Sequence, residues 1–163
     1  MKKIFFFVQF FLFSSVFIFS EEAKAPLRVY VDVVGDLFHS GHIEFFKKAK
    51  GDGNYLIVGI HGDEDVTLYK RKPILTLDER KRSIEACRYV DEVIINSPIG
   101  ITEDWIKKYQ IDLVIHGDDF DEAKLMLQYA VPIKMGIFKT VAYTQGISTT
   151  DIIQRIKDRL TEK

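Results

Sequence analysis

The sequence predicts one α/β domain, built on a doubly wound, parallel, five-stranded sheet of the Rossmann-like kind. Two observations predict it. From Leu27 onward, short apolar runs alternate with longer amphipathic runs, the order expected of strands and helices in a parallel sheet covered on both faces. The 163 residues suffice for one domain with a core and are too few for two ordinary domains. The domain is therefore expected over residues 27–163.

Each strand is predicted from a short apolar run. In chain order these are LRVYVDVV (27–34), YLIVGI (55–60), DEVIIN (91–96), DLVIHG (112–117) and GIFKTVAY (136–143). Each helix is predicted from apolar residues at helical spacing. In chain order these are IEFFKKAK (43–50), LDERKRSIEACRYV (77–90), TEDWIKKYQ (102–110) and STTDIIQRIKDRL (148–160). The last helix has Ser148 or Thr149 as its N-cap, and residues 118–132 are predicted to be irregular.

The composition excludes several classes of function. A formal net charge of -1 and a pI near 6.4 provide no strongly basic surface, so nucleic acid is not an expected partner. The single cysteine, Cys87, excludes an internal disulfide and a cysteine-rich metal site. Because Cys87 lies in a helical-looking segment, we expect a small buried residue rather than a reactive thiol.

Residues 1–26 are set apart from the domain. The start MKK is followed by the apolar run IFFFVQFFLFSSVFIF (4–19), about 16 residues long, whereas a membrane span needs about 20. This pattern is typical of a signal peptide, and Ala23-Lys24-Ala25 offers a cleavage site. Because Pro26 directly follows and disfavours cleavage, membrane attachment through residues 4–19 stays open, as does a misassigned start.

The candidate functional residues follow the predicted strands. In a doubly wound sheet, ligands bind beyond the carboxyl ends of the strands. The sequence places there the segments 36–42, 61–65, 96–97, 116–119 and 143–150. Three of the four histidines stand next to a glycine in these segments, which favours a binding site over chance.

The first of these segments contains two histidines. His39 and His42 are one helical turn apart at the start of a predicted helix, and Gly41 between them leaves room for close approach to the backbone. A helix N-terminus favours anions, so two imidazoles there suit a phosphate whose charge grows during reaction. An alternative is a histidine pair that caps the helix. No third ligand stands at a suitable spacing for zinc, so no metal ligand is assigned.

Four blocks of the sequence resemble one family. DLFHSGH, LDERKRSIEACRYVDEV, IDLVIHGDD and TQGISTTDII occur in the order found in nucleotidyltransferases of the HxGH type, over residues 27–156. The chain most closely resembles the cytidylyltransferases that act on phosphoethanolamine, phosphocholine or glycerol 3-phosphate. The resemblance implies the HxGH nucleotidyltransferase fold and transfer of CMP from CTP to a phosphorylated alcohol, first of all phosphoethanolamine, with release of pyrophosphate. It also implies Mg²⁺ with the triphosphate, and a homodimer formed through CRYVDEV.

The resemblance implies site residues as well. His39, His42 and Lys70 are the expected catalytic residues, although Lys72 competes with Lys70 for contact with the phosphates. The expected nucleotide-binding residues are Val34, Gly35, Asp36, Gly41, Arg80, His116, Gly117, Asp118, Asp119, Thr144, Gly146, Ile147, Ser148, Thr149 and Thr150. Three sets of these residues have alternative roles. Arg80 could instead form a surface salt bridge, and the hydroxyls of residues 148–150 could instead only cap the helix. Asp118 and Asp119 could contact cytosine, bind Mg²⁺ or shape a turn.

The sequence departs from the family pattern at two places. The family has Gly-x-Phe-Asp at residues 33–36, whereas here the glycine is Gly35. The family has arginine at the position of Tyr143, and loss of its charged hydrogen bonds to phosphate removes about 1.5–3 kcal/mol per bond. Lys139 or Lys134 could replace it.

Two other functions compete with the cytidylyltransferase interpretation. One is an adenylyltransferase that acts on a sugar phosphate, and the other is a catalytically silent nucleotide-binding module. Localisation stays open, because CTP is a cytoplasmic substrate whereas the N-terminus predicts export or anchoring.

Overall fold

A computed structural model describes residues 25–119 and 121–162 of the chain. Its five strands form one parallel sheet in the order β3-β2-β1-β4-β5, so the predicted fold class is confirmed. The strands are β1 Arg28–Val33, β2 Tyr55–His61, β3 Glu92–Ser97, β4 Leu113–Gly117 and β5 Phe138–Val141. The chain builds outward from β1 to β3 and then returns to the other side of β1. The order therefore reverses between β1 and β4, where a doubly wound sheet binds its ligand.

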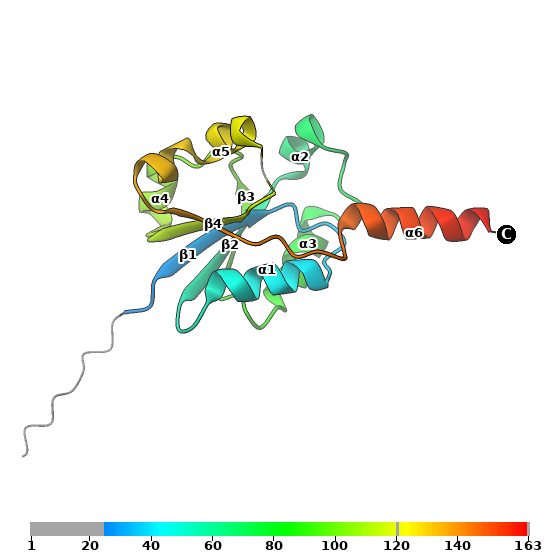
Figure 1. Cartoon of the computed structure of the whole chain (residues 1–163), viewed down its shortest axis with the longest axis horizontal. Helices are drawn as coiled ribbons and strands as arrows, with labels where there is room; N and C mark the ends of the chain where they lie inside the picture. Colours follow the sequence, from blue (N-terminus) through cyan, green and yellow to red (C-terminus); the bar gives the residue numbers. More distant parts are fainter. Residues whose placement is uncertain (1–24, 120, 163) are drawn as a thin grey trace, which may run out of the picture.

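Six helices accompany the sheet in the described ranges. They are α1 Ser40–Lys50, α2 Asp63–Tyr69, α3 Leu77–Glu85, α4 Glu103–Tyr109, α5 Glu122–Lys134 and α6 Thr149–Thr161. Helices α1 and α3 cover one face of the sheet, and α4 and α5 cover the other (Figure 1). Both faces are thus covered, as the continuous apolar strands predict.

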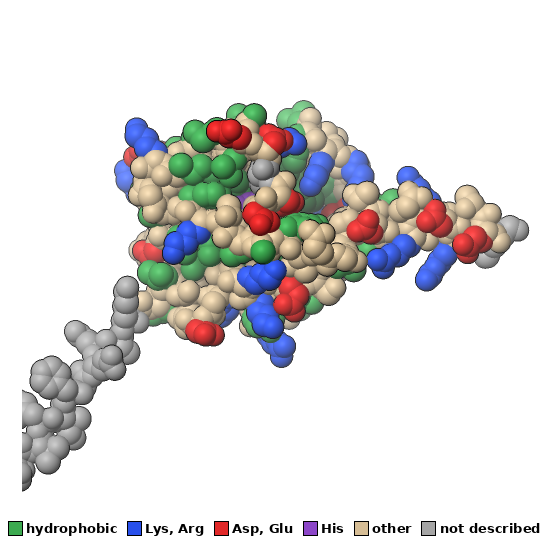
Figure 2. Space-filling model, viewed as in Figure 1, with side chains coloured by type: hydrophobic (Ala, Val, Ile, Leu, Met, Phe, Trp, Pro, Cys, Tyr) green, Lys and Arg blue, Asp and Glu red, His purple; other side chains and the backbone are tan. Residues whose placement is uncertain are grey.

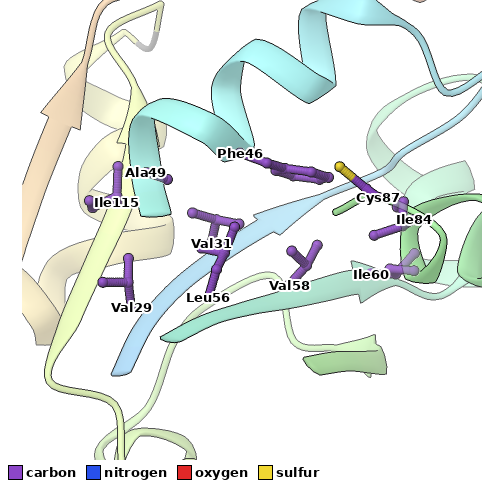
Figure 3. Close-up of a cluster of buried hydrophobic side chains, with 10 residues drawn as sticks. All are labelled: Val29, Val31, Phe46, Ala49, Leu56, Val58, Ile60, Ile84, Cys87 and Ile115. Carbon is purple, nitrogen blue, oxygen red and sulfur yellow. The ribbon is translucent and has the colours of Figure 1, made fainter. Parts of the chain in front are cut away.

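The core consists of two clusters on opposite faces of the sheet. Alternate residues of β1 and β2 point to the α1 side, where they pack against Phe46 of α1 and Ile84 of α3 (Figure 3). Tyr30 and Ile57, at the intervening positions, pack on the α4 and α5 side. Cys87 is buried in the first cluster, so its predicted burial is confirmed.

The prediction that residues 118–132 are irregular is wrong, because α5 occupies most of this range. Asp121 caps the helix by accepting the N–H of Lys124 at 2.9 Å. Pro132 within the helix argues against a helix in the sequence, since proline has no N–H to donate to the carbonyl four residues back. That carbonyl, on Gln128, accepts the N–H of Ile101 at 2.9 Å instead. A contact with a distant loop therefore makes the proline tolerable.

Two helix boundaries differ from prediction, and one helix is not predicted. Helix α1 begins at Ser40, three residues before the apolar run 43–50 that predicts it but at the start that the histidine pair requires, and α3 ends at Glu85 rather than at residue 90. Helix α2 is not predicted at all, because Val66 is its one buried residue and no apolar periodicity results. Its acidic first turn is a sequence signal that could have revealed it.

Helix α6 forms as predicted but extends away from the rest of the domain (Figure 1). None of its residues is buried, and its surface carries both acidic and basic side chains (Figure 2). In the described ranges, no helix is both long and apolar enough to cross a membrane. The predicted signal or anchor segment lies outside the described residues, apart from Ala25 and Pro26.

Candidate active site

A cavity of about 870 Å³ opens beyond the carboxyl ends of β1 and β4. Most of the predicted site residues line it. These are Val34, Gly35, Asp36, His39, Gly41, His42, Lys70, His116, Gly117, Asp119, Thr144, Ile147, Ser148, Thr149 and Thr150. Arg80, Asp118 and Gly146 are not among its lining residues. The sheet topology thus brings together residues from segments that are far apart in the sequence.

His39 and His42 form a reciprocal cap at the start of α1. Nδ1 of His39 accepts the N–H of Gly41 at 3.1 Å, and Nδ1 of His42 accepts the N–H of His39 at 3.3 Å. In a neutral imidazole, a nitrogen that accepts a hydrogen bond leaves the proton on the other nitrogen. Both rings therefore carry their proton on Nε2. The caps use only Nδ1 of each ring, so Nε2–H of each ring is left to donate to a ligand. Capping therefore does not exclude a functional role.

Both histidines are neutral in the site. Burial, followed by the charge of the neighbouring His39, lowers the pKa of His42 to about 3. Burial also lowers the pKa of His39, and Asp151 opposes this effect only in part. The two rings, whose centroids are 4.0 Å apart, therefore act as neutral N–H donors rather than as cations.

The N-terminus of α6 meets that of α1 at the cavity. Ser148 caps α6 by accepting the N–H of Asp151 at 3.1 Å, and the Thr149 hydroxyl donates to the Asp36 carbonyl at 2.9 Å. A Cβ on Gly41 would lie 3.2 Å from the Ile147 carbonyl oxygen and 2.9 Å from the His39 ring. Glycine is therefore needed where these two segments approach. Two helix N-termini at one cavity favour the binding of an anion there.

Asp36 anchors the segment that follows α2. Its carboxylate is almost fully buried and accepts the N–H groups of Ile74 and Leu75 at 3.0–3.1 Å and a guanidinium N–H of Arg71 at 3.0 Å. Burial alone would raise the pKa of Asp36, but the hydrogen bonds from these donors have the larger effect and hold the pKa below its usual value. The anchored segment holds Lys70 at the cavity.

The structure distinguishes the alternatives that the sequence leaves open for Lys70 and Arg80. Lys70 lines the cavity and Lys72 does not, so the geometry favours Lys70 as the phosphate contact. Arg80 is fully buried rather than part of a surface salt bridge. It donates to the carbonyl oxygens of Val34 and His61 and to the Asp63 carboxylate. Arg80 therefore ties the ends of β1 and β2 together behind the cavity.

The glycine that is shifted relative to the family pattern has a structural reason. Gly35 adopts φ +71°, which side chains rarely allow, and a Cβ there would lie 2.6 Å from Cδ1 of Ile84. The turn after β1 therefore packs against α3 only with glycine at position 35.

The segments after β4 and β5 complete the rim of the cavity. Asp118 accepts the main-chain N–H of Tyr143 at 2.8 Å and so joins the two segments, which supports the turn role for this residue. The Tyr143 side chain lines the cavity and is 40% exposed. Neither Lys139 nor Lys134 lines the cavity, whereas Lys124 of α5 does. Lys124 is thus better placed to replace the family's arginine.

At the deep end of the cavity, the sequence indicates His61 through the candidate segment 61–65 but does not indicate Asp32. Asp32, near the end of β1, is 3% exposed and lines the cavity. Its Oδ1 accepts the hydroxyl of Tyr129 at 2.5 Å, and its Oδ2 has no hydrogen-bond partner among the described residues. His61 lies beside it, 5% exposed. A carboxylate inside an otherwise apolar parallel strand is a signal that could have revealed this pocket, because a buried charge normally has a partner.

The chain is similar to known proteins of one family. Residues 35–155 match the model of the cytidylyltransferase-like family. The chain is 42% identical over 139 residues to the ethanolamine-phosphate cytidylyltransferase of Dictyostelium discoideum, which covers 80% of this chain and 38% of that protein. It is 44% identical over 135 residues to the ethanolamine-phosphate cytidylyltransferase of Arabidopsis thaliana, and this match covers 78% of this chain and 32% of that protein. It is 40% identical over 136 residues to the human choline-phosphate cytidylyltransferase A, and this match covers 82% of this chain and 37% of that protein.

The chain therefore spans about a third of the length of these relatives. Among solved structures, the lipopolysaccharide core biosynthesis protein from Thermoplasma volcanium superposes with a TM-score of 0.59 at 28% identity. That superposition covers 74% of this chain and 98% of the other.

Proposed function

The chain belongs to the cytidylyltransferase-like family, and from this premise we propose that it transfers CMP from CTP to phosphoethanolamine and releases pyrophosphate. The product, CDP-ethanolamine, is an activated phospholipid head group. The ethanolamine-phosphate and choline-phosphate cytidylyltransferases to which the chain is similar support this class of reaction.

The choice of substrate rests on one observation: one end of the cavity suits an anion and the other end suits a cation. The rim combines two helix N-termini with His39 and His42, and it suits phosphates. The deep end holds the Asp32 carboxylate, which suits a cation. Phosphoethanolamine carries a phosphate at one end and an ammonium at the other, whereas glycerol 3-phosphate has no cation for Asp32. The site therefore fits a phosphorylated amino alcohol.

The reaction needs positioning and charge stabilisation rather than a covalent intermediate. A phosphate oxygen of phosphoethanolamine attacks the α-phosphorus of CTP in line, and the bond to pyrophosphate breaks. The Nε2–H groups of His39 and His42 donate to the α-phosphate oxygens, on which negative charge develops. Lys70 neutralises charge on the phosphates. Because both histidines are neutral donors, neither has to change its protonation state during the step.

The remaining phosphates and the base of CTP have separate places in this proposal. The first turn of α6, with Ser148, Thr149 and Thr150, receives the β- and γ-phosphates. The end of β4, with His116 and Gly117, receives the cytosine. These assignments follow the resemblance block by block and agree with which residues line the cavity.

Mg²⁺ is proposed to arrive with the triphosphate. This ion is usually held by one or two carboxylates together with substrate phosphates. In the described residues, no group of three or more His, Cys, Asp or Glu side chains could form a metal site by itself. The Asp119 carboxylate lines the cavity near the start of α5 and fits this partial requirement. Mg²⁺ would neutralise part of the triphosphate charge, and Asp119 would hold it.

We also propose a homodimer and membrane attachment. The dimer rests on the resemblance of CRYVDEV, residues 87–93, to the family's interface segment. Attachment rests on the apolar residues 4–19. Light scattering of the purified chain and fractionation of cells that express it, with and without residues 4–19, test the two proposals.

One assay tests the proposed function against its competitors. Pyrophosphate release is measured with CTP or ATP and with phosphoethanolamine, phosphocholine or glycerol 3-phosphate. The proposal expects release with CTP and phosphoethanolamine. Release with ATP alone contradicts it in favour of an adenylyltransferase. Binding of CTP without turnover of any alcohol contradicts it in favour of a silent module.

A further inference from the structure

His61 is a buried side chain at the cavity to which the reaction described above assigns no role. It ends β2, is 5% exposed, and lines the cavity beside Asp32. Its Nδ1 lies 3.1 Å from the Ser97 carbonyl oxygen and 3.2 Å from the Ser97 hydroxyl. A carbonyl oxygen can only accept, so Nδ1 carries the ring proton. In the neutral ring, Nε2 then presents a lone pair.

The backbone of β3 is irregular opposite His61, and this irregularity places Ser97 against the histidine. In the pairing of β2 with β3, Ile60 stands opposite Ile95 but His61 stands opposite Ser97, so Asn96 is an extra residue. Asn96 adopts φ +54°, outside the strand region. Bulges of this kind redirect side chains and are frequent next to functional sites. This bulge brings the fully buried Ser97 against Nδ1 of His61.

Two acceptors consequently face each other at the deep end of the cavity. Nε2 of His61 lies 4.0 Å from Oδ1 of Asp32, which is beyond hydrogen-bond distance. Oδ1 already accepts the Tyr129 hydroxyl, and Oδ2 has no partner among the described residues. A buried carboxylate oxygen without a donor, such as Oδ2 of Asp32, is unfavourable. A cation that brings several N–H donors into the cavity would satisfy Asp32 and at the same time donate to Nε2 of His61.

We propose that His61 makes the site specific for a primary ammonium by accepting one of its N–H groups through Nε2 while Asp32 accepts another. This inference rests on the proposed function and adds a selectivity residue to it. A primary ammonium offers three N–H donors, whereas a trimethylammonium offers none and is held by charge and aromatic faces alone. The trimethylated substrate would leave the lone pair of His61 buried and unpaired.

The test is a methylation series of the substrate with the full chain. The value of kcat/KM is measured with CTP for phosphoethanolamine, its N-methyl and N,N-dimethyl derivatives, and phosphocholine. The wild-type protein should lose at least about tenfold in kcat/KM across the series, the equivalent of one hydrogen bond to a charged group. Use of phosphocholine within about threefold of phosphoethanolamine overturns the inference and leaves the proposed function intact.

Variants then assign the selectivity to His61. His61→Leu should lower kcat/KM for phosphoethanolamine by about tenfold or more and change that for phosphocholine by less than about threefold, so the preference collapses. Ser97→Ala is the matched control, because it keeps the carbonyl that orients the ring and should keep the preference. If His61→Leu does not fold, His61→Gln keeps a donor for Ser97 and an acceptor for the ammonium, and it should retain part of the preference. A folded His61→Leu protein with unchanged preference overturns the inference.

A failure of the proposed function gives a different result. No pyrophosphate with CTP and any phosphoalcohol overturns the proposed function. Calorimetric titration of the same proteins with phosphoethanolamine and phosphocholine then decides the role of His61. Tighter binding of phosphoethanolamine that depends on His61 supports it, and equal or absent binding overturns it.

Discussion

The main-chain N–H of His39 donates to Nδ1 of His42 at 3.3 Å, so the N-cap of α1 and the histidine pair of the candidate site are one arrangement. In an ordinary capping box a carboxylate or amide accepts this bond, and no chemistry depends on it. Here the bond also fixes the proton of His42 on Nε2. The sequence left capping and catalysis as alternatives. In the structure the cap is present, and it fixes the nitrogen that would donate in the proposed reaction.

The two roles of His39 can be separated by substitution. His39→Asn keeps a side-chain acceptor at the N-cap but removes the imidazole Nε2–H, so stability should stay within about 0.5 kcal/mol of wild type. Turnover should fall about a hundred- to a thousandfold, the usual effect of removing one donor to a developing oxyanion. His39→Ala, which loses the cap as well, should cost about 0.5–2 kcal/mol of stability. Urea denaturation and pyrophosphate release measure the two effects, and near-normal turnover of His39→Asn contradicts the proposed role.

The lowered pKa of His42 predicts how stability depends on pH. Its pKa falls from 6.5 to about 3 on folding, so below pH 6.5 the unfolded chain binds a proton that the folded chain does not. Stability contributed by the neutral ring is therefore complete above pH 6.5 and is lost progressively as the pH falls toward 3. His42→Gln keeps an acceptor at the same cap position and does not titrate. Between about pH 5 and 6.5, it should flatten the plot of unfolding free energy against pH by up to about 1.4 kcal/mol per pH unit. Equal slopes for both proteins contradict this expectation.

The anchoring of residues 71–75 by Asp36 predicts a coupled loss of stability and of CTP affinity. Asp36→Ala leaves the N–H groups of Ile74 and Leu75 without their acceptor, at a cost of about 1–3 kcal/mol, and it releases the segment that holds Lys70. The KM for CTP should rise while that for phosphoethanolamine changes little. Arg71→Ala is the control. Its side chain is 44% exposed, so loss of its ion pair should cost less than about 1 kcal/mol. An unchanged KM for CTP in a folded Asp36→Ala protein would show that the anchor is purely structural.

The tyrosine at position 143 predicts weak binding of the triphosphate. Its side chain lines the cavity, and its hydrogen bond to Asp118 uses only the main-chain N–H, so the side chain can be replaced without loss of that contact. Tyr143→Arg should lower the KM for CTP by about tenfold or more through a charged hydrogen bond to phosphate. Tyr143→Leu should leave it nearly unchanged. If Tyr143→Arg has no effect, Lys124 already supplies the missing charge, which Lys124→Ala would reveal as a raised KM.

The sequence predicts the sheet well and the deep end of the site poorly, for physical reasons. A strand buried on both faces is a continuous apolar run whatever its neighbours are, so β1 and β2 are visible in the sequence. Helix α5 is not, because Pro132 is tolerated only through the contact between Gln128 and Ile101, 27 residues apart. The motif residues of the rim come from contiguous blocks. Asp32 and His61 belong to no block, and only strand pairing brings them together.

Asp32 should show opposite effects on stability and on substrate binding. Asp32→Asn keeps an oxygen to accept the Tyr129 hydroxyl but removes a negative charge whose Oδ2 has no partner among the described residues. Loss of an unpaired buried charge should leave the melting temperature unchanged or raise it. The KM for phosphoethanolamine should nevertheless rise by about tenfold or more, because the ammonium loses its counter-charge, while the KM for CTP stays the same. If Asp32 were only a core residue, its substitution would lower the stability of the protein. If Asp32 contacted phosphate, its substitution would raise the KM for both substrates. A higher KM for the amino alcohol alone, in a protein at least as stable as wild type, is expected only if Asp32 is retained for binding a cation.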